Sequence, residues 1–118
     1  MAEQFKNLVD MFEKSVAKYG DQPLFGTKRD GAWQWTKYEQ VGKDVGRLRA
    51  GLASLGVKKG DCVVVVADNR QEWATLAYAC YGLGASLVPM YEAQNPKEWD
   101  FIANDCAAVL VVTGSKRV

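Results

Sequence analysis

The stretch that decides the fold is residues 57–88, VKKGDCVVVVADNRQEWATLAYACYGLGASLV. A polar turn leads into the apolar run Cys62–Ala67, which is followed by a polar segment, an apolar helix over Trp73–Tyr81 and a second strand over Ser86–Pro89. A strand without polar alternation is expected where helices cover both faces of a sheet. The order strand, helix, strand therefore predicts a parallel βαβ unit with a right-handed crossover.

The flanking sequence extends this unit in both directions. Val109–Val112 predicts a third strand, which gives the order βαβαβ. Ahead of the sheet, the pattern predicts a helix over residues 4–19, a small hairpin around Arg29-Asp30-Gly31 with strands at Pro23–Thr27 and Trp33–Trp35, and a helix that ends at Gly56. The predicted fold class is α/β, a three-layer parallel sheet that is part of a larger N-terminal domain.

Three helix starts carry the signature of a side-chain cap, an oxygen-bearing residue three positions before a glutamate. The pairs are Thr36 and Glu39, Asn69 and Glu72, and Asn95 and Glu98. Pro96 occupies the favoured first helical position after the last cap. We therefore expect these glutamates to serve structure rather than catalysis.

Composition excludes several classes of site. A net charge of +1 gives no electrostatic footprint for nucleic acid. The chain has no histidine, so it offers neither a Ser-His-Asp triad nor a Cys-His pair, and its three cysteines lack the spacing of a zinc site. Cys62 and Cys80 are expected to be small buried hydrophobes rather than redox groups. Four tryptophans on different elements are expected in the core or at interfaces: Trp33, Trp35, Trp73 and Trp99.

Ligands of open parallel sheets gather outside the carboxyl ends of the strands. Those ends are Asp68-Asn69-Arg70, Met90-Tyr91-Glu92 and Thr113-Gly114-Ser115. The first segment could present Asp68 or Arg70 to a polar ligand, but a structural role, with Arg70 paired to a neighbouring acid, is favoured. Thr113-Gly114-Ser115-Lys116 lacks the spacing of a phosphate loop, and no Gly-x-Gly-x-x-Gly fingerprint is present.

Several fragments, taken in order, resemble the adenylate-forming (AMP-binding) enzymes, in particular the long-chain fatty acyl-CoA synthetases. The matching fragments are Thr36-Lys37-Tyr38-Glu39, Leu52–Asp61, Asn69-Arg70-Gln71-Glu72-Trp73 and Gly84–Tyr91. The resemblance implies a parent reaction in which ATP and a fatty acid give an acyl-adenylate, and coenzyme A then takes the acyl group. The parent would use ATP, Mg2+ and coenzyme A, and would be cytoplasmic or peripheral to an intracellular membrane.

The family's phosphate loop, aromatic-Thr-Glu segment, ribose-binding aspartate and C-terminal lysine have no counterpart here. No catalytic, cofactor-binding or metal residue is therefore assigned, and no cofactor is expected for this segment alone. We expect residues 1–118 to be a truncated N-terminal subdomain that is inactive alone. The alternative is a free-standing α/β binding module that holds a partner through Trp73–Tyr81. Because that helix is apolar nearly all round, we expect its covering layer to lie in further sequence and the segment to self-associate.

Overall fold

The computed structural model describes residues 2–114, which form four helices and five strands. The helices are α1 (Leu8–Tyr19), α2 (Tyr38–Ser54), α3 (Gln71–Gly82) and α4 (Pro96–Asp105). The strands are β1 (Pro23–Arg29), β2 (Ala32–Lys37), β3 (Cys62–Val66), β4 (Ser86–Met90) and β5 (Leu110–Thr113). The order matches the sequence prediction, with the hairpin strands longer than expected.

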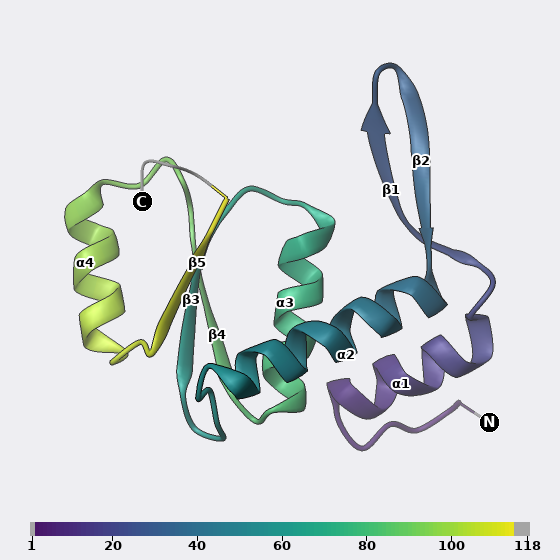
Figure 1. Cartoon of the computed structure of the whole chain (residues 1–118), viewed down its shortest axis with the longest axis horizontal. Coiled ribbons are helices and arrows are strands. Elements are labelled where there is room, and N and C mark those ends of the chain that lie inside the picture. Colours follow the sequence, from purple (N-terminus) through teal and green to yellow (C-terminus); the bar gives the residue numbers. More distant parts are fainter. Residues whose placement is uncertain (1, 115–118) are drawn as a thin grey trace.

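The three C-terminal strands form a parallel sheet in the order β4-β3-β5, so the predicted βαβαβ arrangement is confirmed. The chain moves from β3 to one neighbour and then passes back over β3 to reach the other edge. Right-handed crossovers in opposite directions place their helices on opposite faces. Accordingly, α3 lies on one side of the sheet and α4 on the other, with α2 beyond α3 (Figure 1).

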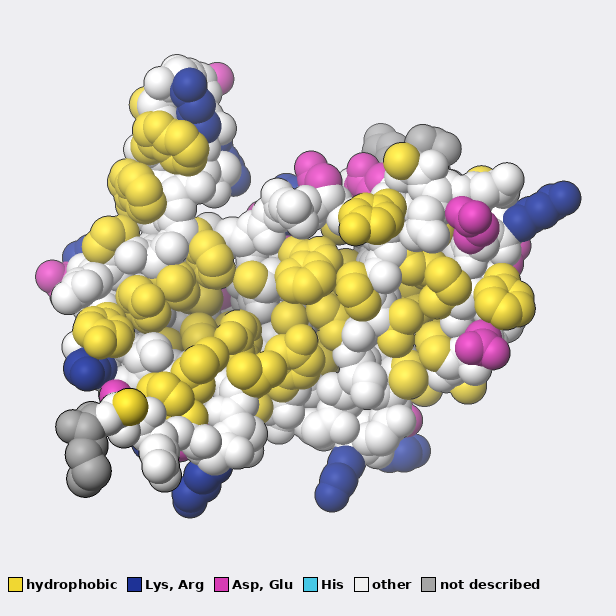
Figure 2. Space-filling model, turned by 180° about the vertical axis from the view of Figure 1, so that it is seen from behind, with side chains coloured by type: hydrophobic (Ala, Val, Ile, Leu, Met, Phe, Trp, Pro, Cys, Tyr) yellow, Lys and Arg dark blue, Asp and Glu magenta, His cyan; other side chains and the backbone are white. Residues whose placement is uncertain are grey.

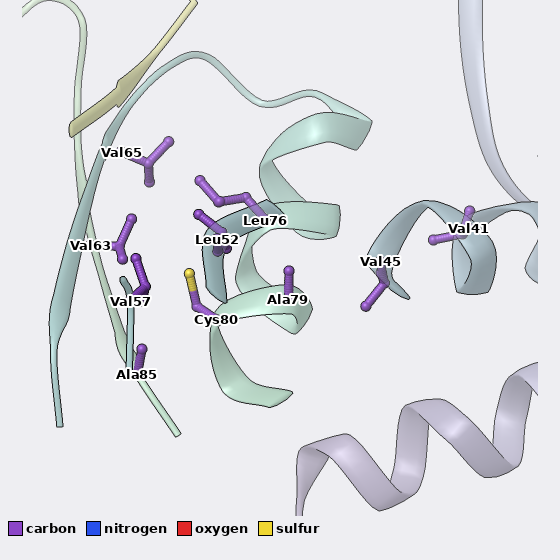
Figure 3. Close-up of a cluster of buried hydrophobic side chains, with 10 residues drawn as sticks. All are labelled: Val41, Val45, Leu52, Val57, Val63, Val65, Leu76, Ala79, Cys80 and Ala85. Carbon is purple, nitrogen blue, oxygen red and sulfur yellow. The ribbon is translucent and has the colours of Figure 1, made fainter. Parts of the chain in front are cut away.

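Both faces of β3 are buried, as its uninterrupted apolar run predicts. Val63 and Val65 belong to a core cluster that includes Leu52 and Leu76, toward which they point (Figure 3). On the opposite face, Val64 and Val66 pack with Met90 and with Trp99 of α4. Strand β3 is therefore buried between two separate hydrophobic clusters, one on each face.

Helix α3 is covered within the chain itself, which corrects the expectation that its covering layer lies elsewhere. Leu76, Ala79 and Cys80 are in the same core cluster as Val63 of the sheet. On its other side α3 packs against α2 and α1, and the Tyr78 ring stacks on Phe12 of α1 with centroids 4.5 Å apart. The apolar character of this helix is explained by its position between the sheet and two other helices.

The two N-terminal helices differ slightly from their predicted bounds. The first was expected from residue 4 but begins at Leu8, because Asn7 caps it by accepting the Asp10 amide at 2.9 Å. The predicted end of α2 is confirmed. Gly56 has φ +92°, and the Val57 amide reaches back to the Leu52 carbonyl at 3.1 Å, as in a Schellman motif.

Of the three predicted caps, only the last is confirmed. The Asn95 side chain accepts the Lys97 amide at 3.0 Å, and Glu98 accepts the Asn95 amide at 3.1 Å. Helix α2 instead begins at Tyr38 without a side-chain cap, since β2 runs on through Lys37 and keeps Thr36 in the strand.

The predicted cap at Asn69 is also wrong. Helix α3 begins at Gln71, and its N-cap is Arg70, again without a side-chain hydrogen bond. The helix starts one position too late for Asn69 to occupy the capping place. Glu72 instead accepts from the Arg70 guanidinium at 3.1 Å.

The hairpin β1-β2 projects from the body of the molecule (Figure 1). Its turn is made by Asp30 and Gly31, both with positive φ, as the Asp-Gly signal predicts. On one face, Trp33 and Trp35 stack with ring centroids 6.1 Å apart and are 60% and 63% exposed. These two tryptophans are therefore outside the core, whereas Trp99 is buried as expected.

Candidate functional site

The loops after β3 and β4 diverge, because one leads to α3 and the other to α4 on opposite faces of the sheet. A groove of about 440 Å³ lies between them. Its lining comes from the two strand ends and the first turn of α3: Ala67, Asp68, Asn69, Trp73, Pro89, Met90 and Tyr91. Such a divergence of neighbouring connections is where open α/β sheets bind ligands. The sequence analysis named both strand ends as places where a ligand could bind, and the structure places them side by side at this groove.

The loop after β4 is held by two hydrogen bonds. The indole Nε1 of the buried Trp99 donates to the Tyr91 carbonyl at 2.9 Å, and the Tyr91 amide donates to Gln94 Oε1 at 2.9 Å. The backbone is fixed while the Tyr91 side chain remains 79% exposed. An exposed phenol on a fixed loop can stack on a ligand ring or donate a hydrogen bond.

Arg70 follows β3 and lies close to the end of β5. Its Nε donates to Glu72 at 3.1 Å, and this carboxylate, with Asp68 and Glu92 further off, raises the pKa of the guanidinium. A Cβ at Gly114, which follows β5, would stand 3.2 Å from an Arg70 nitrogen. The predicted pairing of Arg70 with a neighbouring acid is confirmed. Ser115 and Lys116 of the segment after β5 lie outside the described residues.

Glu72 is held in its charged form. Its own backbone amide, the Arg70 guanidinium and the more distant Arg29 lower the pKa of this carboxyl. Its side chain is 63% exposed, so the pair with Arg70 is a surface ion pair. Arg29 comes from the end of β1, near the tip of the hairpin.

A second groove, of about 640 Å³, lies between the hairpin and the start of α3. It is mainly polar and includes Thr27, Arg29, Gln34 and Thr36 from alternate hairpin positions, together with residues 69–72. Thr36 Oγ1 and Gln71 Oε1, 2.9 Å apart, form the hydrogen bond that joins the two walls. The volume falls within the range of small-molecule sites, about 300–1,000 Å³.

Sequence reasoning missed this groove. Its only signal is the alternation of polar side chains along one hairpin face, and this pattern is also typical of a solvated strand. Nothing in the sequence indicates that residues 36 and 71, which lie on separate elements, are brought together.

Within residues 2–114, no group of three or more His, Cys, Asp or Glu side chains is arranged to hold a metal ion. In the same part of the chain, no helix has both the length and the apolar character needed to cross a bilayer.

The family model for AMP-binding enzymes matches residues 12–118. The chain belongs to the AMP-binding enzyme family. The resemblance inferred from the sequence is therefore confirmed.

Long-chain-fatty-acid--CoA ligases are among the similar curated proteins. The ligase ACSBG1 from Bos taurus is 29% identical over 107 residues, which cover 91% of this chain and 15% of that protein. The ligase FadD15 from Mycobacterium bovis is 34% identical over 91 residues, covering 77% of this chain and 15% of that protein. The chain thus spans about 15% of the length of these relatives.

Solved adenylating enzymes share the fold. The fatty acid AMP ligase from Legionella pneumophila superposes with a TM-score of 0.86 at 20% identity, covering 97% of this chain and 20% of that one. At this identity the likeness concerns the fold. The hairpin and the three-layer sheet therefore occur together in enzymes of this class.

Proposed function

We propose that this chain is the N-terminal scaffold of an AMP-forming long-chain fatty-acid–CoA ligase. The observation that carries the proposal is the continuous match of 91% of the chain to a ligase of which it covers only 15%. In this role, residues 1–118 supply one parallel layer and its hairpin, and the chemistry is performed by other parts of the parent. The parent reaction would convert ATP, a fatty acid and coenzyme A into acyl-CoA, AMP and pyrophosphate.

The co-reactants ATP, Mg2+ and coenzyme A belong to the parent in this proposal. Residues 2–114 contain no group of three or more His, Cys, Asp or Glu side chains arranged to hold a metal ion, and we assign none of these residues to Mg2+. We assign no step of adenylate formation or acyl transfer to them. Their contribution is to fix the strand ends and the two grooves.

The first test is an activity assay on the 118-residue chain. With ATP, Mg2+ and a long-chain fatty acid, pyrophosphate release should stay at the level of a protein-free blank. Turnover above that level would contradict a purely structural role. The reading frame downstream of Val118 gives an independent test, since the proposal expects it to continue into a phosphate loop.

A second candidate is a free-standing binding module of the same fold. It is favoured by one observation, namely that both faces of β3 and the inner faces of α3 are buried by other parts of the described chain. A stop codon directly after Val118, together with a folded monomeric product, would favour this candidate over the scaffold.

We also propose that the isolated chain self-associates through apolar surface. Figure 2 shows a broad band of hydrophobic side chains across one face of the molecule. Large hydrophobic side chains that are exposed include Phe101 at 69%, Val109 at 53% and Val111 at 47%. The net charge of +1 offers little repulsion between copies.

Sedimentation at micromolar concentration tests this proposal. We expect dimers or larger species whose population rises with concentration and persists in high salt, since the contact is hydrophobic. A monomer that binds no hydrophobic dye would contradict it.

A further inference from the structure

Two of the three cysteines come from distant parts of the sequence to the same end of the sheet. Cys62 is the first residue of β3, and Cys106 is the C-cap of α4. Along a strand, alternate residues share a face, so Cys62 lies on the face of Val64 and Val66. That face is the one covered by α4, and Cys106 packs against the same cluster of buried residues.

The backbone after α4 turns back toward the start of β3 and so holds Cys106 near Cys62. Ala107 adopts a left-handed conformation with φ +51°, and the chain then turns so that the Val109 amide donates to the Cys62 carbonyl at 3.0 Å. The Cys106 thiol lies 3.6 Å from the Ala103 carbonyl. Burial, and after it the neighbouring Cys62, raise the pKa of this thiol. The backbone contact and the shared face of the sheet therefore bring the two cysteines to the same place beside the end of α4.

Accessibility separates this pair from the third cysteine. Cys62 and Cys106 are both partly exposed, and none of the three cysteines forms a disulfide in this structure. Cys80 is fully buried in the core between α3 and the sheet. A small oxidant therefore has access to Cys62 and Cys106 but not to Cys80. The expectation that Cys62 is a small buried hydrophobe is wrong, because this residue is partly exposed.

We propose that Cys62 and Cys106 form an oxidative modification site, at which a disulfide ties the start of β3 to the end of α4. With glutathione disulfide as oxidant, one protein thiolate attacks a glutathione sulfur, breaks its S–S bond and releases one glutathione. The second protein thiolate then attacks the protein sulfur of the mixed disulfide and releases another. Two protein thiols are oxidised to one disulfide, and one glutathione disulfide is reduced to two thiols.

The test uses the reduced 118-residue chain, incubated with glutathione disulfide under native conditions and in urea. Burial and the neighbouring Cys62 raise the pKa of the Cys106 thiol, so a mildly alkaline buffer is chosen to increase the thiolate. Trypsin separates the cysteines into three peptides, residues 60–70, 71–97 and 98–116. A non-reducing digest therefore identifies each pairing directly.

Under native conditions we expect the linked peptides 60–70 and 98–116 as the dominant product. The oxidised chain should melt several degrees higher than the reduced one, because the bridge closes a long loop in the unfolded chain. The matched control Cys80→Ser should form the same link, while Cys62→Ser and Cys106→Ser should stop at the glutathione adduct. In urea the preference for this pair should fall toward a mixture of pairings.

Several outcomes would overturn the proposal. They are a native pairing that includes Cys80, links between two copies of the chain, glutathione adducts that never close, or no reaction of the folded chain. Because the wild-type digest alone distinguishes these results, the proposal does not depend on the folding of the serine variants.

Discussion

The Trp35 indole lies over Gly26 so closely that a Cβ at position 26 would stand 2.7 Å from the ring. These two residues are paired across the hairpin, and the next pair on the same face is Lys28 and Trp33. The absence of a side chain at position 26 therefore allows Trp35 to lie flat and to stack on Trp33.

Gly26→Ala should displace the Trp35 ring and weaken its stacking on Trp33. The clashing atoms are the outer end of an exposed side chain, so the ring can move. The loss of stability should therefore stay below the roughly 1–3 kcal/mol of an overpacked core. Far-UV circular dichroism of the coupled indoles measures the effect. Gly46→Ala is the control, because its Cβ would meet nothing within 4 Å. An unchanged indole signal in Gly26→Ala would refute the prediction.

Asn95→Ala and Asn69→Ala should differ in their effect on stability. Asn95 caps α4 through the Lys97 amide, and losing such a cap costs about 0.5–2 kcal/mol. Asn69 lies outside α3, whose N-cap is Arg70, so its replacement should cost less than about 0.5 kcal/mol. Urea titrations of the two variants measure the difference. Equal losses would show that Asn69 also caps a helix in solution.

Thr36→Val should loosen the hairpin from the start of α3. It removes the hydrogen bond to Gln71 Oε1, and a typical bond of this kind contributes about 0.5–1.5 kcal/mol. A double-mutant cycle with Gln71→Ala isolates the contact. If the double variant loses only as much stability as the two single variants together, the contact contributes nothing to stability.

Acid should destabilise the fold through three carboxyls whose pKa is lowered. Asp10 accepts the Lys6 amide and pairs with Lys14, Asp21 pairs with Lys37, and Glu72 is held by its own amide and by Arg70. Each carboxyl binds its proton more weakly in the folded chain than in the unfolded chain. Its contribution is therefore present above the ordinary pKa values of 3.8–4.5 and is lost as pH falls through the lower folded values.

The loss should be modest, because these ion pairs lie at the surface and are screened by salt. Urea midpoints measured from pH 6 to pH 2.5 should fall with pH, and Asp10→Asn should flatten part of that fall. A midpoint that rises toward pH 3 would contradict the sign of the prediction.

The sheet and its helices could be predicted from sequence because their signals are redundant. The run Cys62–Ala67 is apolar throughout, and Gly56 and the Asp30-Gly31 turn each require a backbone conformation that few residues favour. The caps were less predictable. The spacing at Thr36 and Asn69 is the same as at Asn95, but the residue that caps a helix depends on where the preceding segment stops.

The candidate site was predictable only in part. Parallel topology places the carboxyl ends of the strands at one edge of the sheet, but the closeness of Asp68 and Tyr91 depends on the strand order, which the sequence did not predict. The hairpin groove and the nearness of Cys62 and Cys106 depend on how separate elements dock. Such contacts arise from packing and leave no periodic trace in the chain.

The central position of β3 has a consequence for the order in which the molecule assembles. Val64 pairs with Val88, which is 24 residues away, and with Val111, which is 47 residues away. Shorter loops close at a lower entropic cost, and the nearer partner also leaves the ribosome first. The strand that is made first therefore serves as the template, β4 joins it, and β5 is the last to be added. One edge of the sheet, β5, is consequently the last part of the sheet to form.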